Sequence, residues 1–468
     1  MLDVQRWTLD VPSAAGFIPV AMVYPRRILV HVLCVRGTAV IVIGAGIAGL
    51  AAAESLARAG RRVTLLEARH RVGGRMHTIL GHGGTVPIEI GAEFIHGERV
   101  CTWQDIQAAN LPTQRVPDRR WCFAHGKLAE DPGFHNELQS VLGRLGTGGS
   151  DQDLESFLEH TPGLSAWGKV LARDYVEGFH AAPADRMSIR GLARAEAASE
   201  QDGEDQFRLA DGYSALVQKF SQHLWSLGVE LWLETVVRGI RWAAGDVEVL
   251  AQTSHGAHAF RAGQAVVTLP LGVLQARGPE GVFFEPALVS KEEAIRGLGM
   301  GAVTKLTLQF RERFWPVENF GFIHAEDAPL GTWWSDQRGP ILTGWAGGPR
   351  AERLARGGRE ALVAEAVDCL ARFFQVDAAR VRGLLVGAFT HDWLGDPFAR
   401  GAYSFPPVGM ADMPSVLAAP VEGTLFFAGE ATDTSGDLGT VHGALASGRR
   451  AAREALAERP AQIAVARG

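Results

Sequence analysis

The stretch that decides the fold is AVIVIGAGIAGLAAAESLARAGRRVTLLEARHRVGGR, residues 39–75. Its apolar run 39–43 predicts a buried parallel strand, and the alanine-rich run 47–59 predicts a helix that stops at Gly60. The turn between them has the spacing G-x-G-x-x-G, with glycines at Gly44, Gly46 and Gly49. The first glycine permits a tight turn, the second lets a pyrophosphate approach the backbone, and the third lets the helix pack closely on the strand. The stretch therefore predicts a Rossmann-like dinucleotide site.

A second predicted strand, 61–66, ends in Glu67. An acid about 20 residues beyond the glycines is expected to bind the two ribose hydroxyls, which argues against a 2′-phosphorylated nucleotide. The glycine spacing alone is a weak signal because glycines also mark ordinary turns. Strand, glycines, helix, strand and acid nevertheless follow in the order that the motif requires.

The segment LFFAGEATDTSGDLGTVHGALASG, residues 425–448, completes the pattern from the far end of the chain. It predicts a strand over 424–427 and a helix over 441–456 with Thr440 at its N-cap. The N-terminus of that helix would direct partial positive charge toward an electron-rich edge of the cofactor. One cofactor would then be held by both ends of the chain.

Several segments resemble the flavin amine oxidase superfamily, and they occur in the family's order. ARHRVGGRMHT (68–78) resembles its GG-R segment, and IEIGAEFIHG (88–97) resembles the stretch of polyamine oxidases beneath the flavin ring. The others are DGYSALVQKF (211–220), ETVVRGIRW (234–242), VVTLPLGVLQ (266–275), GMGAVTKLTLQF (299–310) and HDWLGDPFARGAYSFPPVG (391–409). The resemblance covers residues 38–460 and implies a flavin monoamine oxidase or polyamine oxidase-like protein that binds FAD.

The resemblance implies specific contacts to that cofactor. Arg75 would contact the pyrophosphate, the backbone of Val237 the adenine, and Glu430 the region of the pyrophosphate or ribityl. Ala402 stands where covalently flavinylated relatives have cysteine, so the FAD is expected to be non-covalent. The full set of expected cofactor-binding residues is Gly44, Gly46, Gly49, Glu67, Arg75, Gly91, Ala92, Glu93, Phe94, Val237, Glu430, Thr440 and Val441.

Three residues are candidates for catalysis: Lys305, Tyr403 and His96. A lysine on an apolar strand needs a polar partner if it is buried, although its alternation with Leu306 leaves open that it faces solvent. In the family this lysine holds a water against the flavin N(5) atom. Tyr403 would flank the amine, while Thr440 occupies the place of a second tyrosine, as in histone-demethylase-like members. His96 would face the substrate channel and hydrogen-bond a substrate nitrogen; a loop histidine without a role stays open.

Two further predictions concern the substrate channel. Glu93 would attract a distal ammonium of the substrate. Trp333, Trp334, Trp345 and Trp393 are candidates for the channel walls, although aromatic residues at such spacing are more often core.

The predicted fold class is α/β, with a Rossmann-like, GR2-type FAD-binding domain interleaved with an α+β substrate-binding domain of the amine oxidase family. Residues 104–205 are expected to be mostly helical, and 286–385 to mix strands with a helix near 358–375. The FAD-binding domain is predicted over 37–103, 206–285 and 386–468, the substrate-binding domain over 104–205 and 286–385, and an N-terminal extension over 1–36.

Composition is that of a globular chain of 468 residues, 47% hydrophobic and 21% charged. A net charge of −6 and a pI near 6.2 disfavour nucleic-acid binding. The cysteines are too widely spaced to predict a zinc site or a disulfide framework, so we expect no metal and a cytoplasmic location; they are Cys34, Cys101, Cys122 and Cys369.

The chain ends carry weaker signals. The apolar run 28–35 is too short to span a bilayer, and a secretory signal or a true start at Met22 stays open. No long apolar helix is expected near the C-terminus, so the membrane anchor of mitochondrial monoamine oxidases is expected to be absent.

The resemblance predicts an FAD-dependent amine oxidase that oxidises a primary or secondary amine, with polyamines among the candidates. Hydride transfer to the flavin would give an imine and then an aldehyde, and O₂ would reoxidise the flavin to give hydrogen peroxide. One alternative is an L-amino-acid oxidase, which needs a cation to hold the substrate carboxylate; the sequence identifies none. The other is a flavin-bound regulatory or chromatin-binding protein.

Overall fold

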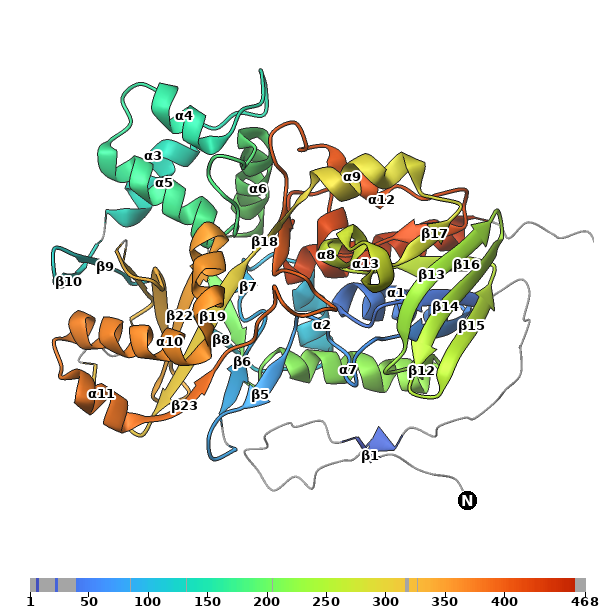
Figure 1. The fold of residues 1–468 in the computed structure, drawn as a ribbon, viewed down its shortest axis with the longest axis horizontal. Coiled ribbons are helices and arrows are strands. Elements are labelled where there is room, and N and C mark those ends of the chain that lie inside the picture. Colours follow the sequence, from blue (N-terminus) through green and yellow to red (C-terminus); the bar gives the residue numbers. More distant parts are fainter. Residues whose placement is uncertain are drawn as a thin grey trace, which may run out of the picture.

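The computed structural model describes residues 39–458 except 85, 132, 204, 316–319 and 326, together with the strands β1 (Arg6–Trp7) and β2 (Met22–Val23). Most of the predicted extension 1–36 therefore lies outside the described residues. The chain folds into two halves that lie side by side in Figure 1. The Rossmann half is built around β3 (Ala39–Ile43), and the seven-stranded half around β19 (Val303–Phe310).

The Rossmann half contains a five-stranded parallel sheet. Its order is β12 (Glu230–Trp232), β4 (Arg62–Leu66), β3 (Ala39–Ile43), β16 (Gln264–Val267) and β25 (Leu425–Phe427). Both faces are buried, which explains the continuous apolar runs of the sequence. Val40 and Val42 pack toward helices, whereas Ile41 and Ile43 pack toward a second sheet.

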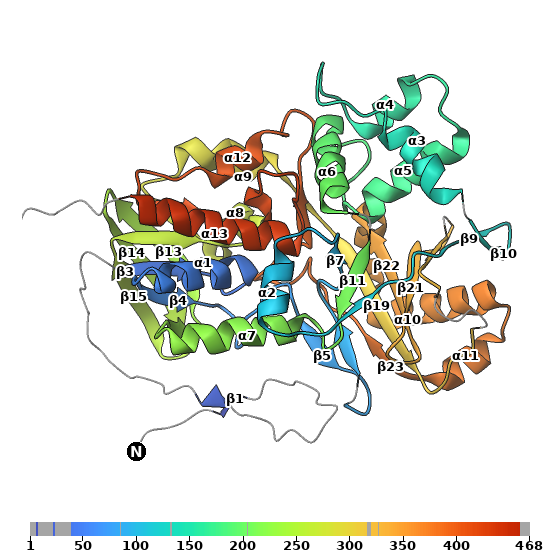
Figure 2. The ribbon, with the colours of Figure 1, turned by 180° about the vertical axis from the view of Figure 1, so that it is seen from behind.

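Three helices cover the first face and lie side by side in Figure 2: α1 (Ile47–Arg58), α7 (Tyr213–Ser226) and α13 (Val441–Ala457). The helices α1 and α13 approach closely because a glycine stands at their contact: a Cβ on Gly448 would lie 2.1 Å from the carbonyl oxygen of Ala48. The predicted helices 47–59 and 441–456 are confirmed within one residue at each end. The second face is covered by β13 (Val236–Ala243), β14 (Asp246–Thr253) and β15 (Gly256–Ala262), which pair with β17 (Phe283–Glu285) in one sheet.

The other half has a seven-stranded sheet. Its order is β10 (Lys127–Glu130), β9 (Arg120–Ala124), β20 (Phe322–His324), β21 (Thr332–Asp336), β22 (Ile341–Gly347), β19 and β23 (Leu385–Phe389). One face packs on α10 (Gly348–Phe374), which bends at Gly358, and on α11 (Ala378–Leu384). The predicted domain boundary at residue 385 falls at the first residue of strand β23. The exact limits of the two domains stay a prediction.

The expectation that residues 104–205 are mostly helical is wrong for part of that range. Strands β8 (Thr113–Arg115), β9 and β10 occupy much of 113–130, because Trp121 and Phe123 pack on the core beside α10 while Arg120 and Cys122 face the other side of the sheet. The helices of this range pack around their own apolar cluster; they are α3 (Phe134–Leu142), α4 (Leu154–His160), α5 (Ala166–Gly178) and α6 (Ile189–Asp202).

Shorter strands and helices complete the fold. The strands are β5 (Thr78–Leu80), β6 (Pro87–Glu89), β7 (Ile95–His96), β11 (Gln206–Leu209), β18 (Gly299–Gly301) and β24 (Tyr403–Phe405). The helices are α2 (Thr102–Ala108), α8 (Leu271–Gln275), α9 (Glu292–Gly297) and α12 (Met413–Ala418). Among the described residues, we find no helix whose length and apolar character suit a membrane span.

Candidate active site

A cavity of about 980 Å³ lies between the halves and is lined by residues of both. All three predicted catalytic residues line it, as do the predicted cofactor-binding residues other than Gly49. The fold therefore brings to one place side chains that the sequence separates by hundreds of positions.

The glycine loop forms one end of this cavity. Gly44 has a φ of +101°, a value that favours glycine, and a Cβ on Gly49 would lie 1.9 Å from the carbonyl oxygen of Gly44. A Cβ on Gly46 would have no atom within 4 Å, although Gly46 lines the cavity. Gly44 and Gly49 thus serve the turn and the packing of α1, whereas Gly46 leaves room for a ligand.

Glu67 lies at the carboxyl end of β4, where the sequence predicts a ribose contact. Its Oε2 accepts a hydrogen bond from the Ala45 N–H (2.8 Å) and its Oε1 from the Arg69 N–H (2.9 Å). Burial raises the pKa of Glu67, although these two hydrogen bonds oppose that effect. Each carboxylate oxygen has a second lone pair for a hydroxyl group. Val237, the predicted adenine contact, also lines the cavity.

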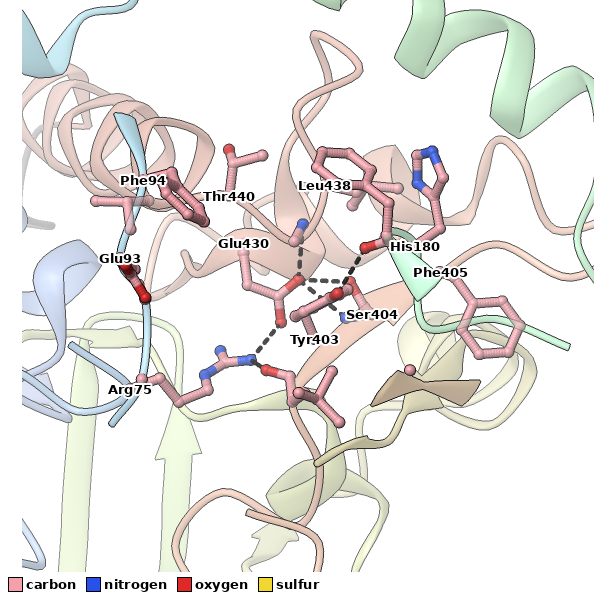
Figure 3. Close-up of a pocket in the computed structure, with 18 of the residues that line it drawn as sticks. Arg75, Glu93, Phe94, His180, Tyr403, Ser404, Phe405, Glu430, Leu438 and Thr440 are labelled. Atoms are coloured by element: carbon pink, nitrogen blue, oxygen red, sulfur yellow. Dashed lines mark hydrogen bonds and ion pairs between the residues drawn. The ribbon is translucent and has the colours of Figure 1, made fainter. Parts of the chain in front are cut away.

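Arg75 and Glu430 form the second contact region. Figure 3 shows Glu430 at the centre of dashed lines to Arg75 and Ser404. Arg75 Nη1 donates to Glu430 Oε1 (2.9 Å) and to the carbonyl oxygen of Ala402 (2.5 Å). Glu430 Oε2 accepts from Ser404 Oγ (2.6 Å) and from the Gly439 N–H (3.1 Å). Through these contacts Glu430 positions Arg75 and the turn before α13.

Thr440 caps α13 as the sequence predicts. Its Oγ1 accepts from the Gly443 N–H (2.9 Å), and its hydroxyl donates to the carbonyl oxygen of Asp437 (2.7 Å). Thr440 and Val441 line the cavity, so the positive end of α13 faces it.

Lys305 is buried on the cavity floor, with 4% of its side chain exposed. Its Nζ lies 2.7 Å from Glu93 Oε2 and 3.1 Å from the carbonyl oxygen of Gly91. The alternative that Lys305 faces solvent is therefore wrong. Its neighbours Leu306 and Leu308 point to the opposite face and pack in the core beside α10.

A row of cross-strand neighbours continues from Lys305 across the sheet. The register pairs Lys305 with Trp345, Trp345 with Thr332, Thr332 with His324, and His324 with Cys122, and all five residues line the cavity. We call them the floor row. Trp334 and Trp393 also line the cavity, but Trp333 is fully buried in the opposite core, so its predicted place in the wall is wrong.

The opposite wall is aromatic. Tyr403 donates its hydroxyl to the carbonyl oxygen of Phe179 (2.5 Å). The Phe179 ring meets the His96 ring edge to face (5.4 Å between centroids) and stacks on Tyr175 (5.3 Å). Burial, with a smaller effect of His442, lowers the pKa of His96 to about 4. His96 is therefore neutral at physiological pH.

The carboxylate of Glu93 binds protein groups, whereas the sequence predicts that it attracts a distal ammonium of the substrate. Its carboxylate already accepts from Arg208 Nε (2.8 Å) and Trp334 Nε1 (2.9 Å) and pairs with Lys305. Burial alone would raise the pKa of Glu93, but Lys305 and Arg208 outweigh burial and hold it below the ordinary value. Two protein cations, Lys305 and Arg208, already neutralise the carboxylate, so Glu93 does not offer an unpaired negative charge to a substrate ammonium.

Sequence reasoning missed a polar group on the helical side of the cavity. Tyr175 donates to Glu196 Oε1 (2.8 Å), and His180 Nε2 lies 3.9 Å from the same oxygen. All three line the cavity, and the side chain of Glu196 is 16% exposed. Their sequence signal is faint, because one acid on the polar helix 189–202 resembles its solvated neighbours.

We expect the folded protein to lose stability in acid because His324 is buried. Burial, aided by Arg120, lowers its pKa to about 3, and Nε2 has no hydrogen-bond partner among the described residues. Between pH 6.5 and 3 the unfolded chain binds a proton there that the folded chain does not, so stability falls as pH falls through this window. His324→Phe keeps the stack on Phe134 (4.2 Å) and should lower proton uptake on urea unfolding at pH 5 by about one proton. Unchanged uptake in a pH-stat measurement would contradict this.

Fold and site together define a nucleotide site of the Rossmann class, with a buried lysine facing the cavity. A family model described as flavin containing amine oxidoreductase matches residues 47–456. Polyamine oxidase 4 of Oryza sativa subsp. japonica is 30% identical, over 90% of this chain and 89% of its own. The chain belongs to the family of flavin-containing amine oxidoreductases.

Two further matches are a second plant protein and a solved structure. Lysine-specific histone demethylase 1 homolog 2 of the same organism is 28% identical over 89% of this chain, but over only 57% of its own length. Among solved structures, a wild-type putrescine oxidase bound to putrescine gives a TM-score of 0.76 at 18% identity, covering 90% of this chain and 99% of that chain. This structural likeness concerns the fold.

Proposed function

We propose that this protein is an oxidase that binds FAD non-covalently and oxidises a primary or secondary amine of a diamine or polyamine. The observation that carries the proposal is the Lys305 ammonium, buried on the floor of a cavity whose other end is the glycine loop. Membership of the flavin-containing amine oxidoreductase family supports the same reading.

The residues present fit FAD. Gly46 leaves space beside the first turn of α1, Glu67 lies at the expected ribose position, and Arg75 supplies a cation. Ala402 lines the cavity and has no nucleophile that could bond to the ring, which supports non-covalent binding. A bound flavin would supply the redox chemistry: it would take a hydride equivalent from the α carbon of the amine, and its reoxidation by O₂, with transfer of two electrons and two protons, would give hydrogen peroxide.

The protein's own groups orient the amine and keep water out. The α carbon must present its C–H while the amine nitrogen is neutral, so that the lone pair assists departure of the hydride and the amine becomes an imine. His96 is neutral above about pH 5 and can accept a hydrogen bond from an amine N–H. Hydrolysis of the imine with water then gives an aldehyde and the remaining amine or ammonia.

The length of the cavity supports a substrate with a second cation. Strands lie about 4.8 Å apart, so the floor row places His324 roughly 14 Å from Lys305. Beyond the rings of His96 and Phe179, Tyr175 and Glu196 offer an aromatic face and a carboxylate, which suit an ammonium group.

Glu196→Gln should therefore raise KM for a diamine or polyamine about tenfold, with a much smaller change for a matched alkyl monoamine. Loss of one partly buried ion pair accounts for this size. Steady-state kinetics on the two substrates check it, with Glu159→Gln, an exposed acid on α4 that does not line the cavity, as the matched control. Equal changes for both substrates would contradict a role for Glu196 in holding a distal ammonium.

The amino-acid oxidase alternative is not favoured. It needs an available cation in the substrate part of the cavity, but Arg120 pairs with Asp118 (3.2 Å) and lies over the Phe322 ring (4.5 Å). Arg350 likewise lies 3.5 Å from Asp174.

Anaerobic bleaching of the bound flavin tests the proposal. The purified protein should be yellow and release FAD on denaturation. Diamines or polyamines should bleach it, and the rate should rise with pH as the substrate amine loses its proton, because His96 is already neutral. A protein that holds no flavin after reconstitution, or one bleached by amino acids and by no amine, would overturn the proposal.

A further inference from the structure

Lys305 belongs to a buried group of alternating charges. Glu93 lies between Lys305 (2.7 Å) and Arg208 (2.8 Å), and all three side chains are at most 7% exposed. Beyond Arg208, the buried Asp336 pairs with Arg338 (2.5 Å) and also interacts electrostatically with Arg208. A buried carboxylate between two cations is stable only while both remain.

The contacts of the Lys305 ammonium determine which of its N–H groups is available to a ligand in the cavity. An ammonium has three N–H donors. Among the described residues, Glu93 and the carbonyl oxygen of Gly91 accept two of them, and the Trp334 ring lies 5.8 Å from Nζ. The third N–H is left for the cavity that Lys305 lines.

Glu93 is itself fixed from several sides. Arg208 Nε and Trp334 Nε1 both donate to its Oε1, which leaves Oε2 for Lys305. The Arg208 guanidinium also lies over the Phe94 ring (4.8 Å) and donates to the carbonyl oxygen of Ser335 (3.3 Å). Neither side chain can move without breaking several buried contacts.

We propose that Glu93, held by Arg208, is a positioning residue that keeps the Lys305 ammonium charged and directs its free N–H toward the flavin. The proposal rests on the proposed function, because it assumes that Lys305 acts beside a bound flavin. It assigns to Glu93 a role through Lys305, in place of a contact to the cofactor or to a substrate cation.

The charges around Lys305 set the expected pH behaviour. They come from β6 (Glu89), the 91–94 segment (Glu93), β11 (Arg208), the end of β21 (Asp336) and the β21–β22 turn (Arg338). Burial raises the pKa of Glu89 to about 7, so Glu93 is the carboxylate in contact that stays charged below neutral pH. Without the Glu93 charge, burial beside the Arg208 guanidinium disfavours the charged ammonium of Lys305.

A double-mutant cycle on flavin reoxidation tests the proposal. The holoenzyme is reduced anaerobically with dithionite, in the absence of any amine, and mixed with O₂ in a stopped-flow instrument. Glu93→Gln should slow reoxidation about tenfold, and more so as pH rises from 7 to 9, whereas the wild type should change little over this range. Lys305→Met with Glu93→Gln should be no slower than Lys305→Met alone, because Glu93 acts through the lysine. Glu196→Gln, a cavity carboxyl that does not contact Lys305, should be additive with Lys305→Met.

The outcomes distinguish failure of the positioning role of Glu93 from failure of the proposed amine oxidase function. Additive effects of Glu93→Gln and Lys305→Met would overturn the positioning role while leaving the amine oxidase proposal intact. An unaltered reoxidation rate in Lys305→Met would also overturn it, and amine bleaching would still report on the proposed function. If Glu93→Gln does not fold, Glu93→Asp, which keeps the charge, and Arg208→Lys replace it. Glu93→Asp should retain the flat pH profile, and a profile that falls as pH rises would count against the proposal.

Discussion

Gly46→Ala should leave the apoprotein folded and weaken FAD binding about 100-fold, a loss of about 3 kcal/mol. Gly46 has φ −69° and ψ 175°, which alanine adopts without strain, and its added Cβ would meet no protein atom within 4 Å. That methyl group would instead enter the cavity where the pyrophosphate is expected to approach the backbone. Fluorescence titration of the apoprotein with FAD measures the affinity, and thermal unfolding of the apoprotein measures the fold.

Gly49→Ala supplies the contrasting control three residues further on. Its Cβ would lie 1.9 Å from the Gly44 carbonyl oxygen, so α1 must move away from the loop and from β3. We expect this variant to lose apoprotein stability as well as FAD. If Gly46→Ala bound FAD normally, or lost stability as Gly49→Ala does, the assignment of this turn to the cofactor would be wrong.

The Rossmann half could be read from the sequence because its signals are local. The strand 39–43, the glycines and the helix at 47 are neighbours in the chain, and each favours the conformation that the next one requires. The N-cap at Thr440 could be predicted for the same reason, since the capping hydrogen bond joins two residues only three positions apart in the sequence.

The pairing of Glu93 could not be predicted in this way. Its partners Arg208, Lys305 and Trp334 come from three strands far apart in the sequence, and nothing in the segment 88–97 shows which charge meets it. The resemblance placed Glu93 correctly beside the cavity but suggested a substrate cation where the fold supplies Lys305. Charge partners across a sheet depend on register, which the sequence alone specifies weakly.

Trp333 and Trp334 illustrate the same limit on a finer scale. Successive side chains of a strand point to opposite faces, so only one of the two can line the cavity. The register of β21 with β20 and β22 places Trp334 toward the cavity and Trp333 against the core beside α10. Composition and spacing treat the two tryptophans alike, and tertiary packing separates them.

Lys305→Met should slow reaction of the reduced flavin with O₂, or reduction by the amine, about 100-fold while FAD stays bound. Methionine matches the length of the lysine stem but removes the ammonium that contacts Glu93. Loss of one preorganised donor in a buried site typically costs about 10²–10³-fold.

Arg208 and Trp334 still satisfy Glu93 in this variant, so the destabilisation should stay well below the effect of an isolated buried carboxylate. Stopped-flow traces of both half-reactions measure the effect, and the flavin absorbance of the purified variant shows whether FAD is retained. Lys305→Arg keeps a cation near Glu93 but changes its shape, so it should recover part of the rate. If both half-reactions of Lys305→Met matched the wild type, the buried ammonium would have no part in the chemistry, and its pairing with Glu93 would serve only to stabilise the fold.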